Sequence, residues 1–181
     1  MALTSTTEKW GAIAKLFHWV IAALVLFMII VGLAAVNAPL SPTKLQLFTI
    51  HKVTGLGIFI LMIARLLWRV INPTPILPPA LAGWERAAAK LTHWLLYGLV
   101  LLMPISGYVI TSAANFPITI FGIFDVPLIV PPDKHTEDLA ESVHVLGFFV
   151  LAALILLHTA AALRHHFILK DDILRRMLPG G

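Results

Sequence analysis

The amino-acid sequence predicts an all-α protein, an integral membrane bundle of four helices. Of its 181 residues 59% are hydrophobic and only 12% are charged, and the mean hydropathy is +0.92. Soluble domains carry about 25% charged residues, so this composition is typical of a membrane protein. Four apolar stretches are each long enough for the roughly 20 helical residues that cross a bilayer. We place these spans near residues 13–36, 47–70, 91–113 and 139–163 of a single transmembrane domain, residues 1–181.

The first span, near 13–36, has one competing interpretation. Pro39 and Pro42 follow it and are expected to close the helix, because proline cannot continue one. A cleavable signal peptide would need a small-residue cleavage site, for which Val36-Asn37-Ala38 is a poor match. The apolar region is also longer than the core of a signal peptide and contains a histidine, which favours a retained helix.

Prolines also mark the connections that follow the second and third spans. Asn72-Pro73-Thr74-Pro75 and then Pro78-Pro79 predict a stiff link between the second and third helices. The connection 114–138 is the longest and is partly apolar, so we expect it to cap one end of the bundle.

Lysine and arginine residues predict the orientation of the chain. With the N-terminus in the cytoplasm, ten of these residues fall at cytoplasmic helix ends and three fall outside. This asymmetry follows the positive-inside rule and predicts that both termini are cytoplasmic, as in a multi-pass protein of a bacterial inner membrane. The cytoplasmic ten are Lys9, Lys15, Arg65, Arg69, Arg86, Lys90, Arg164, Lys170, Arg175 and Arg176; the outer three are Lys44, Lys52 and Lys134.

The net charge of +4 does not point to nucleic acid, because the basic residues form no tract. The sequence contains no cysteine. That absence excludes disulfides, cysteine-ligated iron–sulfur clusters and covalent haem attachment through a CxxCH motif.

Four histidines lie within the apolar stretches, where an ionisable side chain is costly and is by default a functional candidate. They are His18, His51, His144 and His158. His144 and His158 are 14 residues apart on one expected helix, which is roughly 21 Å or four turns, so both rings leave the same face. This spacing predicts a ligand near each membrane surface, as two stacked haems require.

Alternating topology assigns the four histidines to two depths. His18 and His158 lie about one turn from the cytoplasmic surface, and His51 and His144 lie about one turn from the outer surface. Each pair comes from two different helices, as bis-histidine ligation inside a bundle requires. A zinc transporter is the alternative metal protein, but the predicted spans hold no Asp or Glu to complete such a site except Glu141, at the outer edge of the fourth.

Other residues near these depths have a functional and a structural interpretation. Gly32, Gly55 and Gly147 either admit a flat macrocycle or serve ordinary helix packing. Arg65, 14 residues after His51, and Lys52 could contact haem propionates or extend toward the headgroups. His93 is an alternative inner ligand, a quinone contact or a propionate partner.

Several short motifs, in this order and spacing, resemble the bacterial cytochrome b561 family over nearly the whole chain. They are KLFHW (15–19), IHKVTG (50–55), RLLWR (65–69), NPTP (72–75), ESVH (141–144), LHTAAALRHHF (157–167) and KDDILRRMLP (170–179).

The resemblance implies a four-helix inner-membrane protein with two haems b, ligated by His18 with His158 and by His51 with His144. It also implies electron transfer between small donors and the ubiquinone pool; one branch is similar to a superoxide oxidase. An electron-relay or anchor subunit of a larger dehydrogenase or hydrogenase complex is the alternative. The acidic residues before His144, among them Asp133, Glu137, Asp138 and Glu141, temper the superoxide interpretation, because positive potential would steer an anion better.

Overall fold

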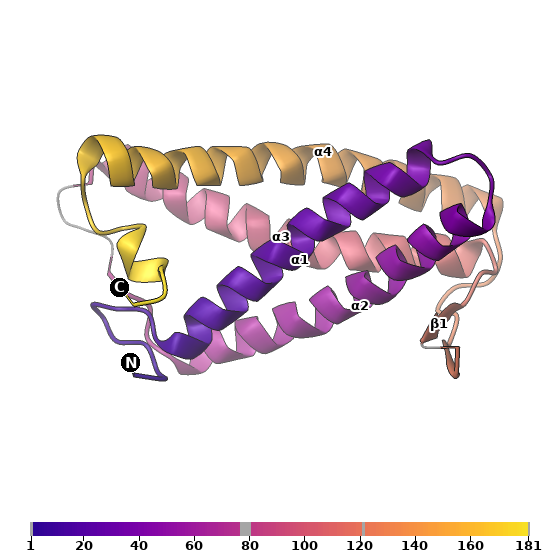
Figure 1. The fold of residues 1–181 in the computed structure, drawn as a ribbon, viewed down its shortest axis with the longest axis horizontal. Coiled ribbons are helices and arrows are strands. Elements are labelled where there is room, and N and C mark those ends of the chain that lie inside the picture. The colour runs from indigo at the N-terminus through magenta and orange to yellow at the C-terminus, as the bar shows by residue number, and fades with distance from the viewer. Residues whose placement is uncertain (1, 77–80, 121, 181) are drawn as a thin grey trace.

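Four long helices lie side by side and make up most of the molecule (Figure 1). The computed structural model describes residues 2–76, 81–120 and 122–180. All four helices are long and apolar enough to cross a membrane, which confirms the predicted all-α membrane bundle. Pro78 and Pro79 of the predicted stiff link lie outside the described residues. The helices are α1 (Ala12–Asn37), α2 (Pro42–Ile71), α3 (Gly83–Ala113) and α4 (Lys134–Arg164).

Three helices, α2, α3 and α4, begin at least five residues before the apolar stretches that predicted them, at Pro42, Gly83 and Lys134 against 47, 91 and 139. α2 begins at Pro42, which therefore opens a helix rather than closing the preceding one. Proline is favoured in the first helical turn, and the Ser41 side chain accepts a hydrogen bond from the Lys44 amide at 3.3 Å. α4 begins at Lys134, capped by Asp133, which accepts from the Thr136 amide at 2.8 Å. These polar first turns lie beyond the apolar core, so hydropathy does not register them.

Both chain termini lie at one end of the bundle, which we call the terminal end (Figure 1). There α4 continues into a π-helix, His165–Leu169, and a short 3₁₀-helix, Arg175–Met177. Lys15 donates to the Leu178 carbonyl at 2.9 Å, and the Trp19 indole donates to the Met177 carbonyl at 2.8 Å. The C-terminal tail is thereby fastened to the first turns of α1.

The opposite end, the hairpin end, carries the long connection between α3 and α4. It includes the antiparallel strands β1 (Ile118–Ile120) and β2 (Phe124–Val126). The Asp133 amide donates to the Ala113 carbonyl at 3.1 Å and closes this connection against the end of α3. The sequence predicted only a loop here, because three-residue strands are too short to show a periodic pattern.

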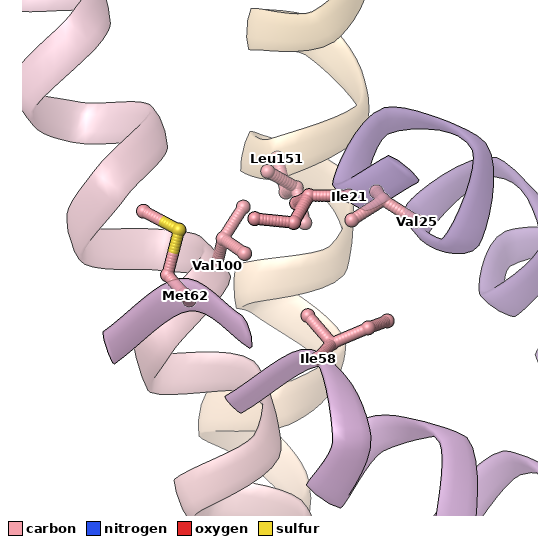
Figure 2. Close-up of a cluster of buried hydrophobic side chains, with 6 residues drawn as sticks. All are labelled: Ile21, Val25, Ile58, Met62, Val100 and Leu151. Carbon is pink, nitrogen blue, oxygen red and sulfur yellow. The ribbon is translucent and has the colours of Figure 1, made fainter. Parts of the chain in front are cut away.

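The helices pack unevenly. α1 packs on α2, α2 on α3, and α3 on α4, whereas α4 makes at most marginal backbone contact with α1 or α2 within the described residues. A core of six side chains from all four helices lies in the middle of the bundle (Figure 2): Ile21, Val25, Ile58, Met62, Val100 and Leu151. Leu151 lies seven residues from both His144 and His158, so this core separates the two histidine depths.

Met62 is the best-buried member of this core, with 2% of its surface exposed, while the neighbouring Ile63 is 40% exposed. We predict that Met62→Ala lowers the free energy of unfolding by about 2 kcal/mol, since the lost packing leaves a cavity. Ile63→Ala removes a side chain that faces lipid and should cost much less. Reversible unfolding in mixed micelles measures both; equal losses would contradict the assignment of the core.

Candidate functional site

The four predicted histidines form two pairs in the structure. The ring centroids of His18 on α1 and His158 on α4 are 6.3 Å apart, with an angle of 68° between the rings. Those of His51 on α2 and His144 on α4 are also 6.3 Å apart, at 67°. The two pairs lie at opposite ends of the bundle and have nearly the same geometry, as depth along the sequence predicted.

The spacing of each pair fits one metal ion held between two imidazoles. A metal–nitrogen bond of about 2.0 Å and about 1.1 Å from nitrogen to ring centroid, counted for both rings, gives roughly 6.2 Å. Among the described residues, no group of three or more His, Cys, Asp or Glu side chains is placed to hold a metal ion. A protein-only zinc site needs three or four such ligands, so the residues present fit an ion whose other ligands come from a macrocycle.

The helices that carry each pair do not pack directly against each other. Both pairs join α4 to α1 or α2, and these are the helices whose backbones do not approach each other closely. Helices in direct contact lie 8–10 Å apart, which leaves no space for a macrocycle between them. The histidines of each pair therefore face each other between helices that do not pack directly on one another.

Glycines line the pair at the hairpin end. A Cβ atom on Gly32 would lie 3.0 Å from Cε1 of His51, and one on Gly107 would lie 3.3 Å from Cε1 of His144. Gly32 thus occupies the position that its spacing from His18 predicted. Gly55 and Gly147 instead pack on the side chains of Met28 and Met103, as the helix-packing interpretation of those glycines expects.

Ser106 fixes the orientation of the His144 ring. Its Oγ lies 3.0 Å from the Met103 carbonyl and 2.9 Å from Nδ1 of His144. The single hydroxyl proton is donated to the carbonyl, so the oxygen accepts from Nδ1–H of the imidazole. The proton on Nδ1 leaves Nε2 with its lone pair free for a metal ion, the usual arrangement around a ligating histidine.

Sequence reasoning missed Ser106 and Gly107. Both lie on α3, which supplies no member of either histidine pair. The available signal was local: Ser106-Gly107 is a pair of small residues inside an apolar span, at the depth of the outer histidines.

Arg65 lies at the pair nearer the terminal end. Its Nη2 is 3.3 Å from Nδ1 of His18, and its guanidinium lies 5.1 Å from the centroid of the Tyr97 ring. Arginine only donates, so Nδ1 of His18 accepts here and the proton lies on Nε2. Binding of a metal ion through Nε2 requires this contact to be exchanged, which frees the guanidinium for an anionic group at the same depth.

His93 and Lys52 lie near the pairs in different ways. His93 is exposed, and its ring centroid lies 5.6 Å from that of His158, closer than the 6.3 Å of the His18 pair. That distance is shorter than two ligands of one metal ion require. The ammonium of Lys52 lies 5.6 Å from the centroid of the Phe116 ring at the hairpin end.

Comparison with known proteins agrees with this architecture. A family model described as prokaryotic cytochrome b561 matches residues 9–180. The chain is 37% identical over 179 residues to "Cytochrome b561 homolog 2" of Escherichia coli K12, covering 98% of this chain and 95% of that protein. It is 29% identical over 179 residues to "Probable superoxide oxidase CybB" of Yersinia pestis, covering 95% of this chain and 97% of that protein.

The fold and these matches define a haem-carrying membrane cytochrome of the b type. More particularly, the chain belongs to the prokaryotic cytochrome b561 family, which confirms the resemblance in its sequence motifs. It is therefore a multi-pass protein of the bacterial inner membrane that takes part in electron transport.

Proposed function

We propose that the chain binds two haems b and carries electrons between a donor on the outer face and the ubiquinone pool. His18 with His158 and His51 with His144 are the proposed axial ligands. The observation that supports this best is the repeated pair geometry, 6.3 Å between ring centroids at both ends of α4. Two pairs that were only hydrogen-bonded structural histidines would have no reason to share one spacing and one angle.

Bound haem b would supply the iron that gains and loses one electron. The chain supplies the axial imidazoles and an apolar sheath that excludes water from the seams between helices. Along α4 the two ligand positions are 14 residues apart, roughly 21 Å. Electrons would therefore cross the membrane between two sites separated by the central apolar core.

Arg65 and Lys52 are the proposed partners of the haem propionates. Arg65 has no carboxylate within 4.0 Å among the described residues, although a cation in a membrane span is costly without an anionic partner. A propionate at the terminal-side pair would provide that charge. Lys52, one residue after His51, is the corresponding cation at the hairpin end.

The termini are proposed to be cytoplasmic. They share one end of the bundle, and the ten basic residues that the sequence predicts to be cytoplasmic belong to the N-terminal segment, the helix ends and the C-terminal tail on that side. The terminal-side pair then faces the cytoplasm, and the His51–His144 pair faces the outer donor.

The charges at the hairpin end bear on which electron donor the chain uses. One relative is named as a probable superoxide oxidase, which makes superoxide a specific candidate. At the hairpin end, however, Lys134 is engaged by Glu137 at 3.1 Å and Asp138 at 3.0 Å. Hydrogen bonds from Thr136 hold the pKa of Asp133 below its usual range and keep it ionised. This acidic surface favours a neutral or cationic donor, or a redox partner protein, over an anion.

The ligand assignment predicts the haem content of single variants. We expect two haems b per wild-type chain, and one fewer after His18→Ala or His158→Ala, or after His51→Ala or His144→Ala, since each removes an axial ligand. Pyridine-haemochrome and reduced-minus-oxidised spectra measure the loss. The two variants of one pair should lose the same haem component of the spectrum, and the component lost should differ between the two pairs. Wild-type haem in His18→Ala would assign that ligand to His93 instead, and His93→Ala is the companion variant.

The glycine beside His51 gives a test that leaves every ligand in place. Gly32→Val adds a Cβ 3.0 Å from the imidazole and should displace it, lowering haem content at the hairpin-side pair only. Gly57→Val is the matched control, because nothing lies within 4 Å of a Cβ there. The two variants are compared by the same spectra. Equal haem loss in both would show a general effect of valine in these helices.

Activity of the isolated chain separates a self-contained oxidoreductase from a subunit of a larger complex. We expect the purified chain in vesicles to reduce ubiquinone with an outer electron donor, superoxide being one donor to test. His144→Ala should abolish that transfer, because it removes a ligand nearest the donor side. Quinone reduction is followed optically. A haem-replete chain that is inert alone, but co-purifies with a redox subunit, would identify the electron-relay or anchor alternative.

A further inference from the structure

The last turn of α4 departs from regular helix where the chain leaves the bundle. Residues His165–Leu169 form a π-helix, and Lys170 follows in the left-handed region with φ 55°. π-turns in helices are often found at functional sites, and a non-glycine residue with positive φ is uncommon. The chain then turns back toward the terminal end of α1 (Figure 1).

This turn borders an open cavity of about 250 Å³, lined by His166, Phe167, Lys170, Asp171 and Arg175. The volume is several times the roughly 30 Å³ of a water molecule, so a phosphate group fits. Two cations and one carboxylate line it. That carboxylate faces its own segment: one Asp171 oxygen pairs with Nδ1 of His165 at 2.6 Å, and the other accepts from the Ile173 amide at 3.0 Å.

Three polar groups of the cavity lack strong partners in the part of the chain that the structure describes. Nδ1 of His166 is buried without a hydrogen bond. The side-chain ammonium of Lys170 makes no hydrogen bond or ion pair with a described residue. Arg175 has only a 4.0 Å pair with the exposed Asp172. A buried polar atom without a partner is costly and points to a ligand that supplies one.

The apolar side chains of the same turn give its depth in the membrane. Phe167, Ile168 and Leu169 are 67%, 72% and 43% exposed, so the described residues leave much of their apolar surface uncovered. Side chains of this kind lie in the acyl region, and the cationic residues that follow lie at the headgroups. The cavity therefore opens where lipid phosphates are concentrated.

We propose that this cavity binds the headgroup of an anionic phospholipid from the leaflet at the terminal end. The phosphate would contact Lys170 and Arg175 and, with the His166 ring turned toward the cavity, accept from its Nδ1–H, while an acyl chain lies along Phe167. Basic pockets at the membrane surface recognise such headgroups by this combination of charge and depth. The site lies outside both histidine pairs, so it does not depend on the proposed function.

The test uses the full-length, haem-loaded protein in nanodiscs of phosphatidylcholine with a minor fraction of phosphatidylglycerol. Spin-labelled lipids of both classes give the relative association constant, and native mass spectrometry counts retained lipids. We expect a several-fold preference for phosphatidylglycerol. Lys170→Gln with Arg175→Gln should reduce it to near one, and His166→Phe, which keeps a ring of similar size, should reduce it in part.

Lys9→Gln with Lys90→Gln is the matched control, because it removes two exposed cations from the same end of the protein. It should keep the preference. No preference in wild type, or an equal loss in this control, would overturn the site. So would displacement of the labelled lipid by inorganic phosphate as readily as by phosphatidylglycerol, which would identify a soluble anion as the ligand. If the double variant does not fold, as judged by its haem spectrum, His166→Phe decides alone.

Discussion

The architecture depends on the cost of an unpaired imidazole in hydrocarbon. Within a bilayer each polar side chain must find its partner inside the protein, because no water is there to replace one. α4 carries a histidine at each end, and α1 and α2 each present one histidine to it at the matching depth. Close packing is left to the other seams, α1 on α2, α2 on α3 and α3 on α4. The paired imidazoles thus lie where α4 does not pack closely on α1 or α2.

The sequence predicts most of this arrangement, because two of its signals are strong. Apolar length identifies the four spans, and alternating topology then gives each histidine a depth without any structure. Depth alone pairs His51 with His144 and His18 with His158, because α4 carries a histidine at both depths. The position of Gly32 is predicted in the same way. Gly32 lies 14 residues after His18, as His158 lies 14 residues after His144, so it shares a helix face with His18 at the depth of the other pair.

What the sequence does not reveal depends on contacts between distant segments. Ser106 and Gly107 act on His144 from α3, a helix without a partner histidine, so only the packing of α3 on α4 shows their role. The starts of α2 and α4 lie in polar turns that hydropathy does not detect. The hydrogen bond from Lys15 to the Leu178 carbonyl joins segments 163 residues apart, and no local pattern marks it.

The two histidine pairs differ in their electrostatic surroundings. At the hairpin end, His144 is held by a neutral hydroxyl, and the ammonium of Lys52 lies over an aromatic ring. At the terminal end, the guanidinium of Arg65 lies within 3.3 Å of His18. A fixed positive charge stabilises an added electron, and more strongly where the dielectric constant is low. In the haem-loaded protein Arg65 and Lys52 are both proposed to pair with propionates, so the charge at the two sites would become similar, and the direction of electron flow would be set by the donor and the quinone rather than by this difference.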